Sequence, residues 1–482
     1  MKILKKLYIK EVTNAIQGEL IQGNENDSVD NVSRDSRETN DSTLFFFLVG
    51  ENQDGHKFLN DVISKGTKNL VISNKECLKN IKNEILLERG DAASSKIFNF
   101  KELNIIHVED TTKALQSLAK YYLNLVSPKV VGITGSVGKT STKDMVSQIL
   151  SSKYKTVKTK GNYNNEIGLP LTIFNIEEET EIAVLEMGAD NFGDIKSLIN
   201  IANPDIGIIT NIGTSHIEKF GSRDGILNEK MSISTYFDDK NCLVYAPDGE
   251  YLVEKKMDFP VILIKKENGN DGDLIIKNVV EKGEFGNQFE LAYKGDSVKF
   301  ELEAIGAHNV VNCALAVAAG LKCGISLQEA SAAIKGIEIT KGRLSIAEKN
   351  GIKIIDDTYN ASPLSVKAAI DLLMKVEGKR KVAFLGDMLE LGEFSEASHI
   401  EIGEYSINKG VDVLVAIGEK SRNTYKAAID LNKSIDGKAK KVIHYKDRKN
   451  AIRELKSILK FGDVVLFKGS RSMHLEEIIN EM

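Results

Sequence analysis

The hydrophobic positions of the chain form short runs separated by polar segments, and the first hundred residues mix strand-like with helix-like runs. Buried strands are predicted at Thr43–Val49 and Asn69–Ser73, and Phe58–Lys65 between them has helical spacing. The polar stretch from Asn80 to Lys101 predicts a loop or linker. We therefore expect a small mixed α/β domain over residues 1–100.

Between about residues 105 and 321, apolar strands and helical segments alternate, as in a parallel, doubly wound sheet. The stretch from Gly272 to Glu303 differs, because several short alternating runs with Gly-containing turns predict an antiparallel meander. Asn309–Leu321 is rich in Ala and predicts a helix. The predicted strands of this central region are Val130–Thr134, Ile182–Glu186, Ile206–Thr210, Cys242–Tyr245 and Val261–Ile264.

From about residue 322 to residue 482 a second series of strands and helices begins, which predicts a separate Rossmann-like domain. The sequence contains no G-x-G-x-x-G segment, so nothing indicates a dinucleotide. The expected fold class is thus α/β with three domains, of which the last two are built on parallel sheets. The predicted strands of the third region are Lys353–Asp357, Val382–Leu385, Val413–Ile417, Lys441–His444 and Val464–Phe467.

Composition fits an ordinary globular protein and limits its partners. At 482 residues the chain is too long for one core. A formal net charge of −5 gives no overall attraction to nucleic acid or to an anionic membrane. The longest apolar run, Leu44–Val49, is far too short to cross a bilayer, and the four cysteines form no C-x-x-C pair. We expect a cytoplasmic protein with no nucleic-acid partner and no membrane insertion.

The most informative motif is Thr134-Gly-Ser-Val-Gly-Lys-Thr140, which directly follows an apolar strand. Gly135 and Gly138 let backbone N–H groups approach phosphates, Lys139 can reach the terminal phosphates, and the Thr140 hydroxyl can ligate Mg²⁺. The helix that follows presents its positive end to the same anion. The motif predicts a triphosphate site, and the alternative is a strand-to-helix turn without a ligand.

The loop departs from the usual spacing G-x-x-x-x-G-K-[ST]. That pattern requires a Gly at position 133, where this chain has Ile133, and Gly132 stands one residue earlier. The motif is therefore a variant phosphate-binding loop.

Polar residues close several of the predicted strands, where ligands bind in open α/β sheets. Glu186 could bind Mg²⁺, although a solvent-facing carboxylate is the simpler alternative. His216 is a candidate metal ligand or acid/base, but a lone His is commonly structural. Asp357 could hold a ribose hydroxyl.

Asparagines form a second set of candidates. The clustered amides of Asn162–Gly168 could hold an uncharged part of a substrate, or could form an Asn-rich turn. Asn309 could simply cap the Ala-rich helix, whereas Asn312, one turn further, could face a nucleobase.

Taken in order, these segments resemble the Mur ligases, the ATP-dependent amide-forming enzymes of peptidoglycan synthesis. The resemblance covers nearly the whole chain. The matching segments are Asp35-Ser-Arg37, Leu44–Gly50 and Asp54-Gly-His56 in the N-terminal substrate domain; Thr134–Thr140, Gly161–Pro170, Glu186–Ala189 and Asn211–His216 in the central ATPase domain; and Asp357–Pro363 at the opening of the third domain.

Two later segments, Leu385–Gly392 and Lys468–Met473, resemble the branch of the family that adds D-Ala-D-Ala to UDP-MurNAc-tripeptide. The Asp-Asn-Pro-Arg motif that is typical of the branch adding the diamino acid is absent from the sequence. The resemblance implies that ATP phosphorylates the terminal carboxylate of the tripeptide. The amine of D-Ala-D-Ala then attacks the acyl phosphate, which yields an amide, ADP and phosphate. It also implies small-molecule substrates only, and we expect a monomer.

The resemblance also implies roles for individual residues around ATP. The loop residues Gly135, Ser136, Val137, Gly138, Lys139, Thr140 and Ser141 would hold the phosphates. Thr140 and Glu186 would bind one Mg²⁺, and His216 a second. Asn309 and Asn312 would lie near the adenine, Arg343 would approach the phosphates, and Asp357 would hold the ribose.

Family members carry a carbamylated lysine near the second metal, and Lys230 is the positional match. The segment Lys230-Met-Ser-Ile departs from the more usual Lys-Gly/Ala-Glu-Ile, so an ordinary solvated lysine is the alternative. A smaller departure is Ser362, where an Asn often precedes the Pro. The substrate-binding residues that the resemblance implies are Asn164 and Asn165 for the UDP-muramoyl part, Ser36 and Arg37 near the uridine, and Asp387 for D-Ala-D-Ala.

Three other functions use some of the same residues. A P-loop switch or motor ATPase would not need a separate third domain bearing Arg343 and Asp357. A non-catalytic nucleotide-binding module would not need Lys139, Glu186 and His216 together. Another Mur-type or folylpolyglutamate-type ligase is the nearest alternative.

Overall fold

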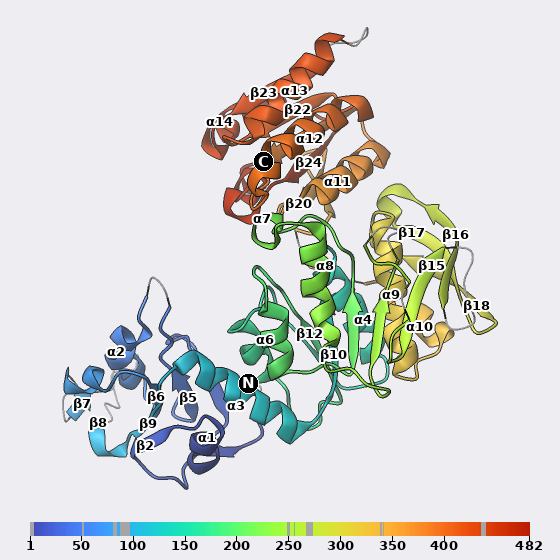
Figure 1. Ribbon diagram of the computed structural model, residues 1–482. Coiled ribbons are helices and arrows are strands. Elements are labelled where there is room, and N and C mark those ends of the chain that lie inside the picture. The colour runs from blue at the N-terminus through green and yellow to red at the C-terminus, as the bar shows by residue number, and fades with distance from the viewer. Residues whose placement is uncertain are drawn as a thin grey trace. The chain divides into compact units, whose positions relative to one another are not determined.

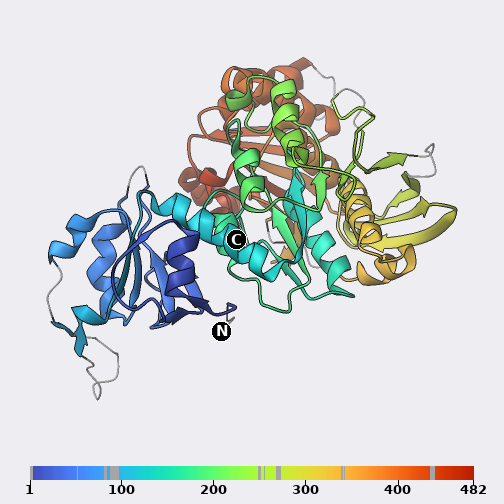
Figure 2. The same cartoon turned by 60° about the horizontal axis from the view of Figure 1, so that its bottom comes forward.

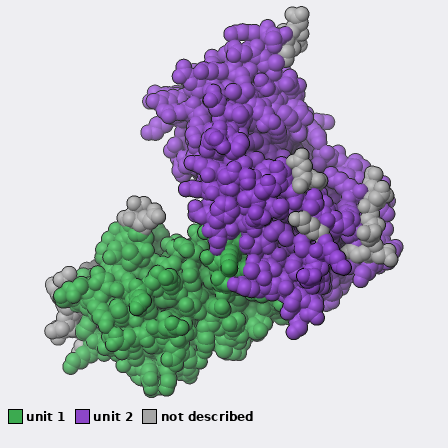
Figure 3. Space-filling view, in the orientation of Figure 1, with its two compact units in different colours: residues 1–132, 154–188, 194–205 green, residues 133–153, 189–193, 206–482 purple. Residues whose placement is uncertain are grey.

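The computed structural model describes residues 4–50, 53–80, 84–86, 97–247, 251–254, 256–266, 273–337, 340, 342–434 and 440–482 (Figure 1). The chain divides into two compact units, coloured separately in Figure 3. The first contains residues 1–132, 154–188 and 194–205, and the second contains residues 133–153, 189–193 and 206–482. Within the described ranges, the helices are too short or too polar to cross a bilayer.

The first unit contains a five-stranded sheet in the order β2-β9-β6-β5-β4. Strands β4, β5, β6 and β9 pair in parallel, and β2 pairs with β9 in antiparallel fashion. Phe45, Phe47 and Leu70 are buried in its core against α2. The two predicted strands and the predicted helix of this region are thus confirmed. The bounds are β2 Glu19–Gln22, β4 Asn31–Ser33, β5 Thr43–Phe46, β6 Asn69–Ile72, β9 Asn104–His107 and α2 Leu59–Ser64.

Two expectations for this region were wrong in detail. The stretch predicted as a loop contains an antiparallel pair of short strands, β7 (Glu84–Leu86) and β8 (Ile97–Asn99), and its residues 81–83 and 87–96 lie outside the described residues. Strand β9 follows the predicted N-terminal range 1–100 and belongs to the same sheet, because Ile105 and Ile106 bury their side chains beside β6. The remaining short elements here are β1 Leu7–Tyr8, β3 Ser28–Val29, α1 Ile9–Ala15, and the 3-10 turns Gly55–Phe58, Lys75–Asn80 and Phe100–Glu102.

Helix α3 (Thr111–Val126) is the longest of the first unit and has clear end signals. The Asp110 carboxylate accepts hydrogen bonds from two backbone N–H groups of the first turn, and Ser127 ends the helix in a left-handed conformation. Leu115, Leu118 and Tyr122 form its buried face. The other elements are β10 Lys129–Thr134, which runs into the second unit, β11 Thr156–Lys158 and β12 Ile182–Glu186, which pair in parallel, α5 Gly168–Ile173 and α6 Asp194–Ile201.

The second unit begins with the strands that follow the phosphate loop. Strands β13 (Ile206–Ile209), β14 (Cys242–Tyr245) and β15 (Val261–Lys266) pair in parallel. Strands β16 (Leu274–Glu281), β17 (Asn287–Tyr293) and β18 (Asp296–Leu302) then form the predicted antiparallel meander, coloured yellow-green to yellow in Figures 1 and 2. The helices of this part are α4 Lys139–Ser151, α7 Ile217–Phe220, α8 Arg223–Met231, α9 His308–Lys322 and α10 Leu327–Ala333, with 3-10 turns at Ser232–Ser234 and Gly283–Phe285.

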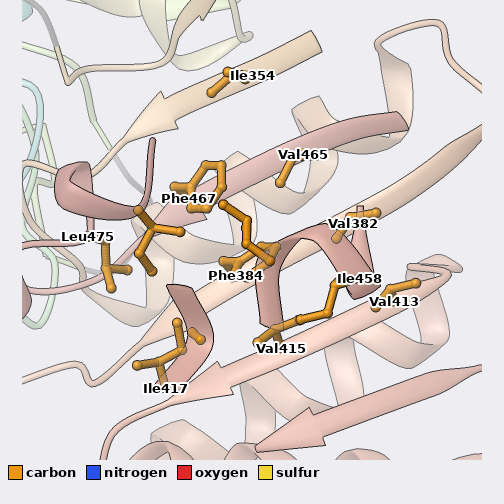
Figure 4. Packing of buried hydrophobic residues seen from close by; sticks show 13 residues of the cluster. Ile354, Val382, Phe384, Val413, Val415, Ile417, Ile458, Val465, Phe467 and Leu475 are labelled. Carbon is orange, nitrogen blue, oxygen red and sulfur yellow. The ribbon is translucent and has the colours of Figure 1, made fainter. Parts of the chain in front are cut away.

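The C-terminal part of the second unit is a six-stranded sheet in the order β19-β20-β24-β21-β22-β23, parallel except for β19. Its core contains Phe384 and Phe467, whose rings stack with centroids 4.8 Å apart (Figure 4). The predicted Rossmann-like series is confirmed. The elements are β19 Ser345–Lys349, β20 Ile352–Asp357, α11 Pro363–Lys375, β21 Arg380–Gly386, α12 Ser395–Lys409, β22 Val413–Ile417, α13 Ser421–Ser434, β23 Lys441–Tyr445, α14 Arg448–Ile458, β24 Asp463–Lys468 and α15 Glu476–Asn480, with 3-10 turns at Gly392–Phe394 and Arg471–Met473.

Candidate functional site

The phosphate loop has a backbone that only glycine accepts at two positions. Gly135 has φ +138° and Gly138 has φ +87°, both outside the range that other residues prefer. A Cβ on Gly135 would lie 2.0 Å from Oγ1 of Thr210, and one on Gly138 would lie 3.0 Å from Oδ1 of Asn312. Gly138 caps helix α4, so the N-terminus of α4 follows the loop directly. This is the geometry of an anion-binding loop.

The end of strand β13 fixes the loop from the side. Val137 N donates to Oδ1 of Asn211 at 3.0 Å, and Val137 O accepts from Nδ2 of Asn211 at 3.0 Å and from Oγ1 of Thr210 at 2.6 Å. Ser136 donates its N–H to Asn211 O at 3.1 Å and accepts from Gly213 N through Oγ at 2.9 Å. The sequence placed Asn211 in a strand-end motif without revealing this bracing role.

Lys139 folds back over the loop that it follows. Its Nζ donates to Gly135 O at 2.6 Å and lies 3.4 Å from Ser136 O. A phosphate oxygen at the loop would compete with these carbonyls for the ammonium group, because a hydrogen bond from an ammonium to an anionic oxygen is stronger than one to a neutral carbonyl. Thr140 and Ser141 are buried in the first turn of α4.

Helix α9 places Asn312 beside the loop, and Asn309 is bonded to Asn312. Asn312 Nδ2 donates to Oδ1 of Asn309 at 2.9 Å, and Asn309 Nδ2 donates to Ile305 O at 2.8 Å. The helix begins at His308 with Ala307 at the capping position, so the interpretation of Asn309 as the cap was wrong. Asn312 lies beside Gly138, and its contact with a nucleobase stays a prediction.

Arg343 reaches the same loop from the segment before β19. Its Nη2 donates to Oγ1 of Thr140 at 3.2 Å, and its guanidinium lies 3.8 Å from the ring centroid of Tyr359. Its Nε is buried without a hydrogen-bond partner among the described residues. A buried N–H donor without a partner is costly, so this atom is a candidate contact for an anion.

Asp357 closes strand β20 and is buried beside Lys468 of β24. The two residues lie opposite each other in the parallel ladder, and Nζ of Lys468 donates to Oδ2 of Asp357 at 2.5 Å and to Asn360 O at 2.8 Å. Burial lowers the pKa of Lys468, and the Asp357 carboxylate opposes that shift. Lys468 was known only as the first residue of a family segment. Its position at the end of a buried apolar strand could have indicated that Lys468 pairs with a carboxylate, because a lysine is rarely buried without one.

His216 stands between two carboxylates. Its Nδ1 lies 2.8 Å from Oε2 of Glu390 and its Nε2 lies 3.5 Å from Oδ1 of Asp190. Both His216 and Glu390 have positive φ, +58° and +64°, which non-glycine residues adopt rarely. The hydrogen bond from His216 lowers the pKa of Glu390. Glu390 belongs to the segment expected near D-Ala-D-Ala, but the sequence did not single it out.

Asp387, the residue predicted for that substrate, has its carboxylate engaged locally. Oδ1 accepts hydrogen bonds from Ser421 N at 2.7 Å and from Ser421 Oγ at 2.5 Å, at the start of helix α13. A Cβ on Gly418 would lie 2.3 Å from the same carboxylate. The side chain therefore stabilises the loop around it, and its direct contact with a substrate stays a prediction.

Lys230 lies in the last turn of α8 and is 2% exposed, so the interpretation as an ordinary solvated lysine was wrong. Its Nζ lies 5.6 Å from the ring centroid of Phe220. A buried lysine loses hydration, and neutralisation or chemical modification relieves that cost.

In the first unit, Glu186 and Asn164 lie together. Nδ2 of Asn164 donates to Oε1 of Glu186 at 2.9 Å, and Glu186 N donates to Oγ1 of Thr159 at 2.9 Å. Glu186 is 2% exposed, so the solvent-facing alternative was wrong. Oδ1 of Asn165 accepts from Gly168 N at 2.8 Å, at the start of α5, which fits the turn that was the alternative for these amides.

Arg37 forms a bidentate pair with its neighbour Asp35. Nε lies 2.9 Å from Oδ1 and Nη2 lies 2.6 Å from Oδ2. These bonds lower the pKa of Asp35 to about 2. The Arg37 side chain is exposed, and Ser36 is half-buried beside it. Their contact with uridine stays a prediction.

Comparison with known proteins explains this arrangement. The model of the Mur ligase middle domain matches residues 133–320, and the model of the Mur ligase glutamate ligase domain matches residues 342–471. A relative from Bacillus subtilis (strain 168), UDP-N-acetylmuramoyl-tripeptide–D-alanyl-D-alanine ligase, is 36% identical over 99% of this chain and 98% of its own length. The chain belongs to the Mur ligase family.

Solved structures of Mur ligases agree with this assignment over nearly the whole chain. Crystal structure I of MurF from Acinetobacter baumannii has a TM-score of 0.85 at 28% identity and covers 99% of both chains. MurF from Thermotoga maritima in complex with ADP has a TM-score of 0.75 at 28% identity, covering 94% of this chain and 96% of its own.

In this Mur ligase, the second unit brings four of the residues predicted for the nucleotide into two contacting pairs. Gly138 lies against Asn312, and Thr140 against Arg343. Within the described part of the chain, no three His, Cys, Asp or Glu residues form a ready-made metal cage. The hydroxyl of Thr140 in the second unit and, separately, the carboxylate of Glu186 in the first unit are each of the hard oxygen type that Mg²⁺ prefers. Mg²⁺ typically uses one or two carboxylates and completes its shell with water and substrate phosphates, so the residues present fit it.

Proposed function

We propose that this Mur ligase uses ATP to join D-Ala-D-Ala to the terminal carboxylate of UDP-MurNAc-tripeptide, releasing ADP and phosphate, in the synthesis of cell-wall precursors. The observation that supports an ATP-dependent ligase most strongly is the hydrogen bond from Arg343 to Thr140, because it joins the C-terminal part of the chain to the phosphate loop. The choice of substrates rests on the names of the full-length relatives.

An oxygen of the substrate carboxylate is a poor leaving group, so the reaction must first convert it into a good one. In the proposed mechanism the substrate carboxylate attacks the γ-phosphorus of ATP, the bond from that phosphorus to the β,γ-bridging oxygen breaks, and an acyl phosphate and ADP result. The amine of the dipeptide then adds to the acyl carbon, and phosphate leaves from the tetrahedral intermediate. The protein supplies position and neutralising charge rather than covalent chemistry.

The loop residues from Gly135 to Ser141 would surround the phosphates with backbone N–H groups, and Lys139 would move from its own loop carbonyls to the β- and γ-phosphates. Arg343 would bind a further phosphate oxygen through the Nε that has no described partner. Asn309 and Asn312 would line the adenine. Asp357, oriented by Lys468, would hold the ribose.

Two Mg²⁺ sites belong to the proposal, one at Thr140 and Glu186 and one at His216. Bound Mg²⁺ would neutralise charge on the transferring phosphoryl group. Glu390 would hold the proton of His216 on Nδ1, so that the lone pair of Nε2, which lies 3.5 Å from Asp190, would bind the metal. A carbamate on Lys230 would turn this buried cation into an anion facing the second site.

Substrate positions and cellular setting complete the proposal. Ser36 and Arg37 would meet the uridine, Asn164 and Asn165 the muramoyl part, and Asp387 the dipeptide loop. We assign substrate binding to residues 1–100 together with β9 (Asn104–His107), ATP binding to residues 108–321, and the ligase domain to residues 322–482. The enzyme would act in the cytoplasm as a monomer.

The decisive experiment measures phosphate release from ATP with the UDP-linked tripeptide and D-Ala-D-Ala, supplied singly and together. We expect release only when both are present. Phosphate release that depends on neither substrate would contradict the proposed ligase activity and favour a switch or motor ATPase. Replacing D-Ala-D-Ala by single amino acids or by glutamate tests the alternative of another Mur-type or folylpolyglutamate-type ligase, which would accept them.

A further inference from the structure

The carboxylate of Asp144 is buried in helix α4, one turn after Thr140. Asp144 is 3% exposed, and Lys143 Nζ lies 3.5 Å from its Oδ1. Residues four apart on a helix share a face, so Thr140 and Asp144 point to the same side of α4. A buried carboxylate is expensive unless strong hydrogen bonds compensate its lost hydration, so the bonds that it makes show its purpose.

Besides Lys143, the carboxylate of Asp144 has a partner in a distant segment. Oδ2 of Asp144 accepts from Thr340 Oγ1 at 2.7 Å and lies 3.3 Å from Thr340 N, although the two residues are 196 positions apart in the chain. Thr340 belongs to the connection between α10 and β19, and Arg343 follows it by three residues.

The same connection is held at its other end by Tyr359. Tyr359 N donates to Gly342 O at 3.3 Å, and the Tyr359 ring lies 3.8 Å from the guanidinium of Arg343. Arg343 thus packs directly against Tyr359, and Thr340, three residues before it, is bonded to Asp144. From that position its Nη2 reaches Oγ1 of Thr140 and its Nε stays buried without a described partner.

We propose that Asp144 is a positioning residue that, through Thr340, aims Arg343 at a phosphate group of the nucleotide bound by the loop. The inference deepens the proposed function and rests on it, because it needs a nucleoside triphosphate at Gly135–Thr140. Helix α4 thereby uses one face for two tasks: Thr140 meets the nucleotide, and Asp144 anchors the connection that brings the arginine to it.

The test measures binding of Mg²⁺ and a non-hydrolysable ATP analogue to the full-length protein by calorimetry. Arg343→Gln should weaken binding about tenfold or more, since it removes a charge-assisted hydrogen bond. Thr340→Val keeps the shape of the side chain but removes its donor, and should weaken binding about three- to tenfold. Thr340→Ser keeps the hydroxyl and should bind within about twofold of wild type.

Gln148 provides a matched control on the same face of α4. It lies four residues beyond Asp144, and its Nε2 donates to Ala333 O at 2.8 Å and to Lys335 O at 3.2 Å, at the beginning of the same connection. Gln148→Leu removes comparable contacts that do not reach Arg343, so it should leave binding within about twofold of wild type.

The double variant Thr340→Val/Arg343→Gln separates positioning from general packing. If Thr340 acts through Arg343, the double variant should bind no more than about twofold weaker than Arg343→Gln alone. If the fold-losses in affinity of the two single variants multiply in the double variant, the inference is overturned while the proposed function stays intact. A loss of affinity in Gln148→Leu equal to that in Thr340→Val would have the same consequence. A wild-type protein that does not bind the analogue would overturn both. Unchanged unfolding midpoints exclude misfolding as the cause of any loss.

Discussion

Nζ of Lys468 lies 2.5 Å from Oδ2 of Asp357, and both side chains are buried where β24 and β20 end side by side. The carboxylate proposed for the ribose is therefore part of the C-terminal core and is oriented before any nucleotide arrives. A second bond from Lys468 to Asn360 O holds the ammonium group as well. Lys468, which orients the Asp357 carboxylate proposed to bind the ribose, is thus a structural residue.

Replacing Lys468 with Met should destabilise the protein by about 3–5 kcal/mol, because it leaves the buried Asp357 carboxylate without its cation. The free energy of unfolding in urea measures the change. The double variant Lys468→Met/Asp357→Leu removes both charges and should recover most of the loss. A single variant that unfolds within about 1 kcal/mol of wild type would show that the pair contributes little.

Lys139→Ala should lower kcat by on the order of 10²-fold or more, because it removes the positive charge that would stabilise the transferring phosphoryl group. Nζ of Lys139 donates to two carbonyls of its own loop, so we expect the unfolding midpoint to change little in this variant. Steady-state phosphate release together with thermal unfolding measures both effects. Turnover like that of wild type would remove Lys139 from the mechanism.

The parallel strands and the phosphate loop were predictable from the sequence because their signals are local. Apolar β-branched runs such as Val130–Thr134 and Val413–Ile417 have few alternatives to a buried strand. The need for Gly135 and Gly138 follows from motif spacing, and the structure adds the atoms that exclude a Cβ.

Contacts between distant residues were not predictable, because no local pattern encodes them. No sequence pattern around Asp144 indicates that it bonds to Thr340, and nothing in Lys230-Met-Ser-Ile indicates that the lysine is buried. Polarity misled the interpretation of Asn80–Lys101, where short strands pair despite many charged neighbours. The engagement of Asp387 by Ser421 likewise depends on the register of β21 against β22.

Lys230→Ala should lose most activity and regain part of it when a small carboxylic acid such as acetate is added. The buried position of Lys230 means that truncation leaves room for a carboxylate in place of the proposed carbamate. Lys230→Met is the matched control, because it fills the same space with an apolar chain and should not respond to acetate. Full activity of Lys230→Ala without acetate would reject the carbamate.

The pair of Asp35 and Arg37 predicts a stability effect confined to acid. Hydrogen bonding to Arg37 lowers the pKa of Asp35 from 3.8 to about 2. Since the folded-state pKa is the lower one, the pair stabilises the fold above the unfolded-state pKa of 3.8, and this stabilisation is lost as pH falls from there toward 2. The effect should be small because the Arg37 side chain is exposed. NMR titration of the Asp35 carboxyl carbon should show its pKa returning toward 3.8 in Arg37→Gln. An unchanged pKa in that variant would show that Arg37 is not the cause.

Gly135→Ala should lower the free energy of unfolding more than Gly161→Ala does, although both glycines have positive φ, +138° and +53°. At Gly161 nothing lies within 4 Å of an added Cβ, so the cost should be only the left-handed backbone penalty of about 1–2 kcal/mol. At Gly135 the Cβ would lie 2.0 Å from Thr210 Oγ1, the hydroxyl that holds Val137 O, so the bracing of the loop must break. Urea unfolding should rank the two variants in that order, and calorimetry should show nucleotide affinity lost in Gly135→Ala alone. Equal losses of stability and affinity in both variants would show that backbone conformation, rather than the contact with Thr210, explains why glycine stands at position 135.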